Sequence, residues 1–435
     1  MMNPGKRLSK LIAGLAIVAS LFTISAAAQN DMPKIAREYV RLVLAMGQHD
    51  KDYVDAYYGP DDLKKDAEGA TLTLDAIATG VKALQSQVAA LPADADELGR
   101  LRQQYLEKQL SAVGARARML KGERLTFDEE SRALYDAVSP SYPDSHYQAM
   151  LDRLDKRFPG SGSLVERYDA WRRAFVIPRE KLDTVFQAAI GGCRERTLAH
   201  VKLPENEHFT VEYVTNKSWS GYNWYQGNFR SLIQVNTDLP IYIDRAVDLA
   251  CHEGYPGHHV YNALLEQHLV RDRGWIEFTV YPLFSPQSLI AEGTANFGIE
   301  VAFPGRERVA YEQKTLFPLA GLDGGRAAEY YDVMALVDQL SYAGNEAARR
   351  YLDGQIDAAA ATAWLERYAL MPRDRAAQRV RFFDQYRSYV INYTYGKDLV
   401  RTFIESRGGT PSNPARRWAE FLKLLSSPRL PSGLR

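Results

Sequence analysis

The chain has 435 residues, long enough to bury a large hydrophobic core as one big domain or as two lobes. Hydrophobic residues make up 46% of it and charged residues 25%, which is typical of a soluble globular protein. Lysine plus arginine equals aspartate plus glutamate, at 54 each, so the charge gives no reason to expect nucleic acid or an anionic membrane surface as a partner.

The N-terminal segment has the features of a secretory signal peptide. A basic region precedes a short apolar stretch over residues 11–24, and small alanine residues follow before Gln29. We therefore expect residues 1–28 to be a signal peptide. No cysteine follows the cleavage point, so lipid anchoring is not expected there, and no later stretch reaches the roughly 18 apolar residues of a membrane span. The mature protein is expected to be periplasmic or secreted, without stable membrane insertion after signal removal.

Residues 29–205 are predicted to form a helical lobe. Helical periodicity recurs over residues 33–46, 73–91, 96–120, 145–158 and 164–175, separated by polar turns. This segment contains no cluster of candidate catalytic or metal-binding residues, so we interpret it as one wall of a cleft. Residues 206–435 are predicted to form the second lobe, and both lobes are expected to belong to one continuous domain.

The second lobe begins with the only stretch typical of β-structure. Residues 209–214, 220–225 and 231–236 are rich in strand-forming residues, and Gly227-Asn228 separates the last two. They predict one small antiparallel sheet.

The most informative stretch is Cys251 to Tyr261, which reads C-H-E-G-Y-P-G-H-H-V-Y. A zinc peptidase needs two imidazoles on one metal and a glutamate beside the first. The motif H-E-x-x-H provides them on one helix, because residues i and i+4 share a face. His252 and Glu253 begin such a pattern, but the i+4 position is a proline, which cannot bind a metal. The next candidates are His258 and His259.

A regular helix would not bring either histidine to His252. Position i+6 is turned about 120° away, and position i+7 lies roughly 10 Å along the axis. Pro256 has no N–H to donate to the carbonyl of His252, so the helix must kink or bulge, and Gly257 tolerates the backbone angles required. A bulge of two residues would bring His258 to the place of the second ligand. The stretch is therefore interpreted as a zinc (Zn²⁺) site with an insertion, in which Glu253 acts as general base.

This stretch resembles the H-E-x-x-P-G-H-H signature of a bacterial family of zinc-peptidase-like proteins of unknown function, grouped with the gluzincin metallopeptidases. Residues 257–261 are also similar to the G-H-A-L-Y ending of H-E-x-G-H-A-L-Y in thermostable carboxypeptidase-type and oligopeptidase-type enzymes. That comparison selects His258 as the second ligand, so His259 becomes a candidate for bonding substrate or oxyanion. Tyr261 stands where many relatives have glutamine.

The resemblance implies a mainly α, large helical gluzincin-like metallopeptidase fold, with a central cleft and one small antiparallel sheet beside the zinc helix. In gluzincins an edge of this sheet pairs with the extended substrate backbone, whereas a purely structural hairpin is the alternative. The third ligand in gluzincins is a downstream glutamate, and family members carry a similar E-G-x-A segment. Here Glu292 begins Glu-Gly-Thr-Ala in a helix predicted over residues 286–303. Asn296 and Glu300 follow on roughly the same side and are candidates for orienting a histidine ring.

The C-terminal part is again helical, with long helices predicted over residues 326–352, 357–368, 373–393 and 413–425, and Gly396 as a break. Related peptidases place a late tyrosine, near a glycine, where it donates a hydrogen bond to the oxyanion. The family's Y-x-x-G pattern maps Tyr393 onto that position, although three tyrosines lie within seven residues there. Aromatic core packing is the alternative for any one of them.

The only two cysteines are Cys193 and Cys251. One disulfide is possible on count, but we expect Cys251 to be a small buried thiol rather than a metal ligand.

Together these features predict a zinc metallopeptidase that hydrolyses peptides, with His252, His258 and Glu292 as ligands and Glu253 as base. Two alternatives stay open at this point: an exported binding protein without activity that retains the fold, and a zinc amidase acting on a non-peptide substrate. The bond that is cut and the oligomeric state do not follow from the sequence.

Overall fold

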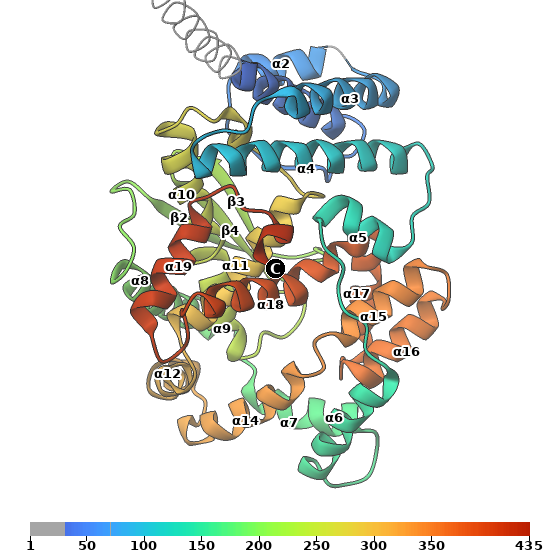
Figure 1. Cartoon of the computed structure of the whole chain (residues 1–435). Helices are drawn as coiled ribbons and strands as arrows, with labels where there is room; N and C mark the ends of the chain where they lie inside the picture. The colour runs from blue at the N-terminus through green and yellow to red at the C-terminus, as the bar shows by residue number, and fades with distance from the viewer. Residues whose placement is uncertain (1–30, 70) are drawn as a thin grey trace, which may run out of the picture.

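The computed structural model describes residues 31–69 and 71–435. The predicted signal peptide, residues 1–28, lies outside these ranges. None of the helices in these ranges combines the length and the hydrophobicity of a membrane span. The described chain is mainly helical with two small sheets (Figure 1), as the sequence predicted.

Helices α2 (Asp61–Gly69), α3 (Leu74–Ala90) and α4 (Glu97–Leu120) lie together at one end of the molecule (Figure 1). Helices α3 and α4 pack along each other, and Thr73 caps α3 by accepting a hydrogen bond from the backbone N–H of Ala76 (3.2 Å). Both helices were predicted from their periodicity. The first described helix covers residues 31–47, and α5 (Phe127–Tyr135) follows α4 in the chain.

The next helices continue the predicted helical pattern and lead toward the sheet. They are α6 (Asp144–Arg157), α7 (Leu164–Arg172) and α8 (Leu182–Leu198). Side chains of α6 and α7 form a second, smaller hydrophobic cluster with residues from the C-terminal part, such as Val333 and Tyr368. The main cluster draws on residues from Met32 to Leu434, so residues 29–205 and 206–435 contribute to a shared core.

The residues that the structure describes form two small sheets. The larger contains the three predicted strands, β2 (His208–Val214), β3 (Gly221–Gly227) and β4 (Arg230–Asn236), in the order β2-β4-β3. Strands β3 and β4 form the expected antiparallel hairpin, whereas β2 runs parallel to β4. The second sheet, which the sequence did not predict, pairs β1 (Val54–Tyr57) antiparallel with β5 (Val280–Pro282).

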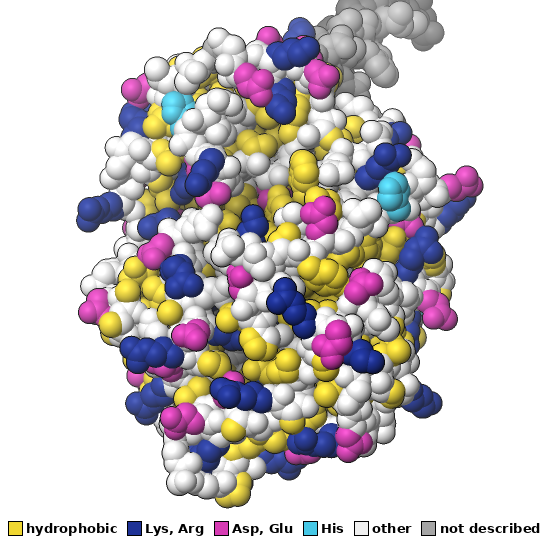
Figure 2. All heavy atoms as spheres, turned by 180° about the vertical axis from the view of Figure 1, so that it is seen from behind, with side chains coloured by type: hydrophobic (Ala, Val, Ile, Leu, Met, Phe, Trp, Pro, Cys, Tyr) yellow, Lys and Arg dark blue, Asp and Glu magenta, His cyan; other side chains and the backbone are white. Residues whose placement is uncertain are grey.

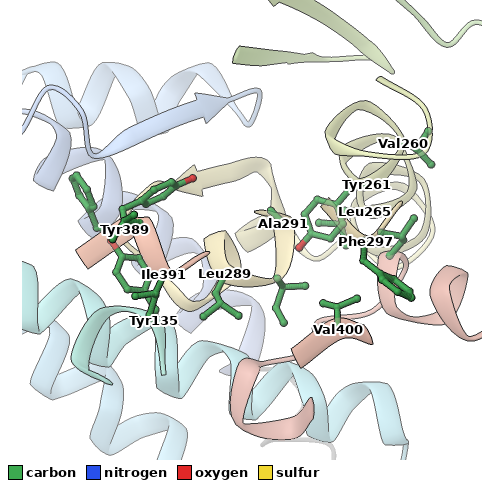
Figure 3. Packing of buried hydrophobic residues seen from close by; sticks show 14 of the residues in the cluster. Tyr135, Val260, Tyr261, Leu265, Leu289, Ala291, Phe297, Tyr389, Ile391 and Val400 are labelled. Atoms are coloured by element: carbon green, nitrogen blue, oxygen red, sulfur yellow. The ribbon is translucent and has the colours of Figure 1, made fainter. Parts of the chain in front are cut away.

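Four helices form the centre of the molecule: α9 (Asp244–Leu249), α10 (His258–Leu265), α11 (Pro286–Ala302) and α18 (Ile391–Ser406). Helix α11 is buried along most of its length and packs on α18 and α10. Figure 3 shows Leu289, Ala291 and Phe297 of α11 among buried residues of these neighbouring helices. A helix that is apolar on nearly all sides is expected at such a central position.

The long helix predicted over residues 326–352 is wrong, because the structure has two helices there. They are α14 (Ala327–Asp338) and α15 (Ala343–Leu352). Between them, the N–H groups of Leu340 and Ser341 bond three residues back, to Val337 and Asp338. This tighter turn allows Leu340 to join the second hydrophobic cluster.

The helix predicted over residues 373–393 also ends early. Helix α17 (Arg373–Tyr386) stops because Arg387 adopts a positive φ of 52°. Buried Glu130 of α5 stabilises this turn by accepting hydrogen bonds from Arg387 Nε (2.6 Å) and the backbone N–H of Ser388 (3.1 Å). A short 3-10 turn then leads into α18, and the predicted break at Gly396 is absent.

Gly396 lies inside α18, where a Cβ atom would stand 2.9 Å from the carbonyl oxygen of Leu289. The glycine therefore permits the close approach of α18 to α11. The remaining helices are α12 (Arg306–Tyr311), α13 (Phe317–Ala320), α16 (Ala358–Tyr368) and α19 (Pro414–Leu425).

The surface mixes charges of both signs. On the face shown in Figure 2, acidic and basic side chains are interspersed rather than gathered by sign. This distribution agrees with the equal numbers of acidic and basic residues.

Candidate metal centre

The bend predicted at Pro256-Gly257 is present between α9 and α10. The backbone first widens into a π-helical turn over Ala250–Gly254 and then leaves the helix at Tyr255. The N–H of Gly257 donates to the carbonyl of Cys251 (2.9 Å), and α10 begins at the next residue, His258. The insertion therefore forms a bend that returns the chain toward His252.

Gly257 is required by the tightness of this bend. A Cβ atom at this position would overlap the carbonyl oxygens of His252 and Cys251. Gly257→Ala should therefore lower the free energy of unfolding by about 3 kcal/mol, at the upper end of the cost of overpacking. Urea unfolding of the metal-free protein measures this.

Gly191→Ala is the matched control, because Gly191 is exposed in α8 and an added Cβ would meet no atom within 4 Å. There alanine should be neutral or stabilising. Equal effects of the two substitutions would contradict the role assigned to Gly257.

The bend brings the three predicted ligands together. Their ligand atoms all lie within 4.8 Å of one another, on α11 and on the two sides of the bend. His252 Nε2 is 3.2 Å from His258 Nε2 and 3.2 Å from Glu292 Oε2, and His258 Nε2 is 3.7 Å from the same oxygen. The imidazole rings stand nearly perpendicular, at 85°.

The chemistry of this cluster fits a divalent metal ion. Two imidazole nitrogens and one carboxylate are a ligand set that zinc takes in catalytic sites. Glu292 Oε2 is buried, and its contacts with the two imidazoles at 3.2 and 3.7 Å do not have hydrogen-bond geometry. Burying a carboxylate oxygen without a hydrogen bond costs free energy. A cation bound between these groups would therefore stabilise the cluster.

The electrostatics of the cluster favour charge separation. Burial alone would raise the pKa of Glu292, but the imidazoles of His258 and His252 hold it well below its usual range. Burial opposes protonation of His258, whereas Glu292, Glu253 and Asp55 raise its pKa to about 9. The site therefore holds an ionised carboxylate and strongly favours positive charge beside it.

Neighbouring side chains hold the ligands in place. The amide oxygen of Asn296 lies 3.2 Å from His252 Nδ1, and its amide nitrogen donates to the carbonyl of Tyr393 (3.2 Å). Tyr389 donates its hydroxyl hydrogen to Glu292 Oε1 (2.8 Å). Of the two orienting candidates, Asn296 contacts a ligand, whereas Glu300 forms ion pairs with Arg401 and Lys397. Tyr389 was not singled out from the sequence.

Glu253 lies beside the cluster and is only 4% exposed. Strand β3 holds it: Asn223 donates to its backbone carbonyl (2.7 Å), and a Cβ on Gly221 would stand 2.6 Å from its Oε1. Burial raises the pKa of Glu253. A carboxylate that binds a proton more readily than usual suits a general base.

His259 points away from the cluster. Its ring is fully buried, with Nε2 3.0 Å from Glu207 Oε2 and Nδ1 2.9 Å from Ser231 Oγ. Tyr255 and Arg194 also bond Glu207 (2.6 and 2.8 Å). With both ring nitrogens bonded to the protein, His259 is placed to fix the start of α10 rather than to contact a substrate.

Tyr393 packs between Phe382 and Tyr389 (ring centroids 6.2 and 5.8 Å). Its hydroxyl makes no hydrogen bond with a described residue, unlike that of Tyr389. Burial and the carboxylates of Glu292 and Glu253 raise the pKa of Tyr393, so its hydroxyl stays protonated within electrostatic reach of the cluster.

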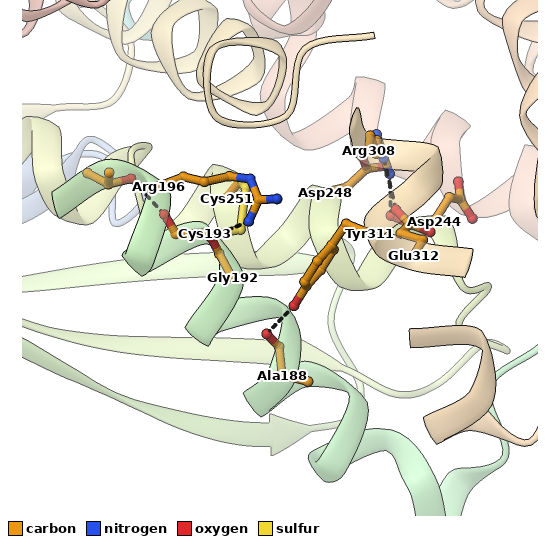
Figure 4. Close-up of a disulfide and its surroundings, with 11 residues drawn as sticks. Ala188, Gly192, Cys193, Arg196, Asp244, Asp248, Cys251, Arg308, Tyr311 and Glu312 are labelled. Carbon is orange, nitrogen blue, oxygen red and sulfur yellow. Dashed lines mark hydrogen bonds and ion pairs between the residues drawn. A yellow bond between two sulfur atoms is a disulfide. The ribbon is translucent and has the colours of Figure 1, made fainter. Parts of the chain in front are cut away.

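A disulfide joins Cys193 of α8 to Cys251, the residue before His252 (Figure 4). The expectation of a free buried thiol at Cys251 is therefore wrong, because α8 brings its partner into range. The side chain of Cys251 is committed to this bond and does not join the ligand cluster. The disulfide ties the bend to α8, which Tyr311 also contacts by donating to the carbonyl of Ala188 (2.6 Å).

Comparison with known proteins gives little further information. No family model and no curated protein matches the chain. Among solved structures, the chain is similar to a "putative lipoprotein" from Colwellia psychrerythraea, with 15% identity and a TM-score of 0.48. The similarity covers 83% of this chain and 68% of the other.

Proposed function

We propose that this protein is an exported, zinc-dependent metallopeptidase that hydrolyses short peptides. The observation that carries the proposal is the convergence of His252, His258 and Glu292, with ligand atoms within 4.8 Å, beside the buried carboxylate of Glu253. The resemblance of the bend to the H-E-x-x-P-G-H-H signature supports the same assignment.

The ligand set favours zinc, because two histidines and one glutamate leave room for water and substrate on the metal. When bound, zinc supplies a Lewis acid that lowers the pKa of water and polarises a peptide carbonyl. Proton transfer and stabilisation of the oxyanion are assigned to side chains of the protein.

Glu253 is assigned to take a proton from the attacking water and to deliver it to the leaving amine. Tyr393 is assigned to donate a hydrogen bond to the oxyanion, because its hydroxyl has no described partner and stays protonated. Asn296 and Tyr389 are positioning residues, since each bonds a ligand rather than the reacting atoms.

The disulfide supports export. Disulfides persist in oxidising compartments and are rare in the cytosol. The bond between Cys193 and Cys251 therefore agrees with the N-terminal segment predicted to direct the chain to the periplasm or beyond.

Metal removal and restoration test the proposal. The mature protein should cleave members of a short-peptide mixture, lose this activity on chelation and recover it with one equivalent of zinc, as followed by mass spectrometry. Peptides that bind without being cut would contradict the proposal and favour the binding-protein alternative. Cleavage only of non-peptide amides would favour the amidase.

A further inference from the structure

Asp55 lies at an irregularity in the small sheet beside the metal centre. In the pairing of β1 with β5, Val54 stands opposite Pro282 and Ala56 opposite Tyr281, so the register shifts at Asp55. Such bulges re-aim a side chain and are frequent next to active sites.

The surroundings of Asp55 connect it to the proposed base. Tyr222 of β3 donates its hydroxyl hydrogen to the carbonyl oxygen of Asp55 (3.3 Å). At the preceding residue, Gly221, an added Cβ would stand 2.6 Å from Oε1 of Glu253, so this part of β3 runs beside both acidic residues. Burial raises the pKa of the Asp55 carboxyl to about 7; the hydroxyl of Tyr222 and the charge of His258 lower this pKa, whereas Glu292 and Glu253 raise it. The carboxylate of Asp55 therefore lies within electrostatic reach of the candidate centre.

Asp55 does not complete the ligand set, and no cationic side chain in the described part of the chain pairs with it. Its oxygens are not among the ligand atoms that lie within 4.8 Å of one another. Among the described residues, no lysine, arginine or histidine forms an ion pair with it, although most buried carboxylates of this chain have such a partner. The hydroxyl of Tyr281, on the paired strand, is also buried without a hydrogen-bond partner among the described residues. Burial raises the pKa of Tyr281, and the carboxylates of Glu292 and Asp55 raise it further.

The charge balance of the centre leaves one carboxylate without a positive partner. A bound Zn²⁺ would balance the negative charges of Glu292 and Glu253, which leaves that of Asp55 uncompensated. A half-buried carboxylate without a positive partner is unfavourable, so a cationic group of the substrate would stabilise it.

We propose that Asp55 binds a primary ammonium group of the substrate, and that this group is the α-amino terminus, so that the protein removes residues from the amino end of peptides. The inference rests on the proposed function. The α-nitrogen of a residue lies only about 2.5 Å from its own carbonyl carbon. A carboxylate that holds this nitrogen beside Glu253 therefore directs the first peptide bond to the metal centre.

Binding measurements test this without requiring turnover. The zinc-loaded Glu253→Gln protein is titrated calorimetrically with trialanine, with N-acetyl-trialanine and with N-acetyl-Lys-Ala-Ala. Trialanine should bind at least about tenfold more tightly than its acetylated form, as expected for a charge-assisted hydrogen bond. Adding Asp55→Asn should abolish the difference.

The matched control is Asp52→Asn in the same background. Asp52 precedes β1 and accepts a hydrogen bond from Gln385 (3.1 Å), so the control removes a nearby charge without touching the bulge. It should retain the preference for trialanine. If N-acetyl-Lys-Ala-Ala binds as tightly as trialanine, Asp55 holds a lysine side chain instead, and the assignment to the amino terminus is wrong.

Equal binding of the free and acetylated peptides, or no binding of either, would overturn the ammonium site, even if the wild-type protein cleaves peptides. Selective binding by Asp55 in a protein that cleaves nothing would support the site and reject the peptidase. The two proposals therefore fail in distinguishable ways.

Discussion

Glu253→Gln is expected to leave zinc bound and to lower kcat/KM for peptide hydrolysis by about 10²- to 10⁴-fold, the contribution of general acid–base catalysis. Glutamine keeps the size of the side chain and fits the space that the missing Cβ of Gly221 leaves, but it cannot take a proton from water. Steady-state kinetics together with metal analysis of the same samples measure both effects.

Glu300→Gln is the control for this substitution. Glu300 also lies near the end of a central helix, but its carboxylate pairs with Arg401 and Lys397, away from the ligands. The control should retain activity within about twofold, because the Glu300 carboxylate pairs with cations at the partly exposed end of α11 and is not among the ligand atoms. Full turnover by Glu253→Gln would show that another group is the base.

His258→Ala is expected to abolish stable zinc binding. It removes one of three ligands, so the loss of affinity should exceed the about 10- to 100-fold that removal of an outer-shell partner costs. His259→Ala, one residue later, should keep zinc, because its imidazole is bonded to Glu207 and Ser231 instead.

The His259 variant should show a different defect. Removing a buried ring that bonds two polar groups should lower the free energy of unfolding by about 1–3 kcal/mol. Competition with a chromogenic chelator measures zinc affinity, and urea unfolding measures stability. Loss of zinc in His259→Ala, with retention in His258→Ala, would reverse the assignment of the second ligand.

Local sequence rules were sufficient for the bend but not for its surroundings. The missing N–H of Pro256 and the absent side chain of Gly257 act within one helical turn, so they predict where the helix is interrupted. The choice of His258 over His259 as the second ligand came from the resemblance. Glu292 lies on another helix, and its selection depended on resemblance, because no spacing rule specifies how α11 packs on the bend.

Contacts between distant segments account for what sequence reasoning missed. Strands β1 and β5 have four and three residues and lie more than 200 positions apart, too short for a periodicity signal. Asp55 lies at a bulge only because β1 pairs with β5, so the sequence alone does not distinguish it from other acidic residues. Likewise, the number of cysteines permits a disulfide, but only the packing of α8 on the bend forms it.

The cluster of late tyrosines shows the same limit. Tyr389 and Tyr393 are four residues apart, and spacing alone does not decide which hydroxyl faces Glu292. The turn at Arg387, fixed by Glu130 of α5, sets this choice: Tyr389 bonds the ligand, and Tyr393 keeps its hydroxyl free of described partners.

The zinc content of the purified wild-type protein tests the central claim most directly. Elemental analysis after exhaustive dialysis, with reconstitution where metal has been lost, should find one zinc per chain. Absence of tightly bound zinc after reconstitution would contradict a metal centre at His252, His258 and Glu292, and with it the proposed peptidase.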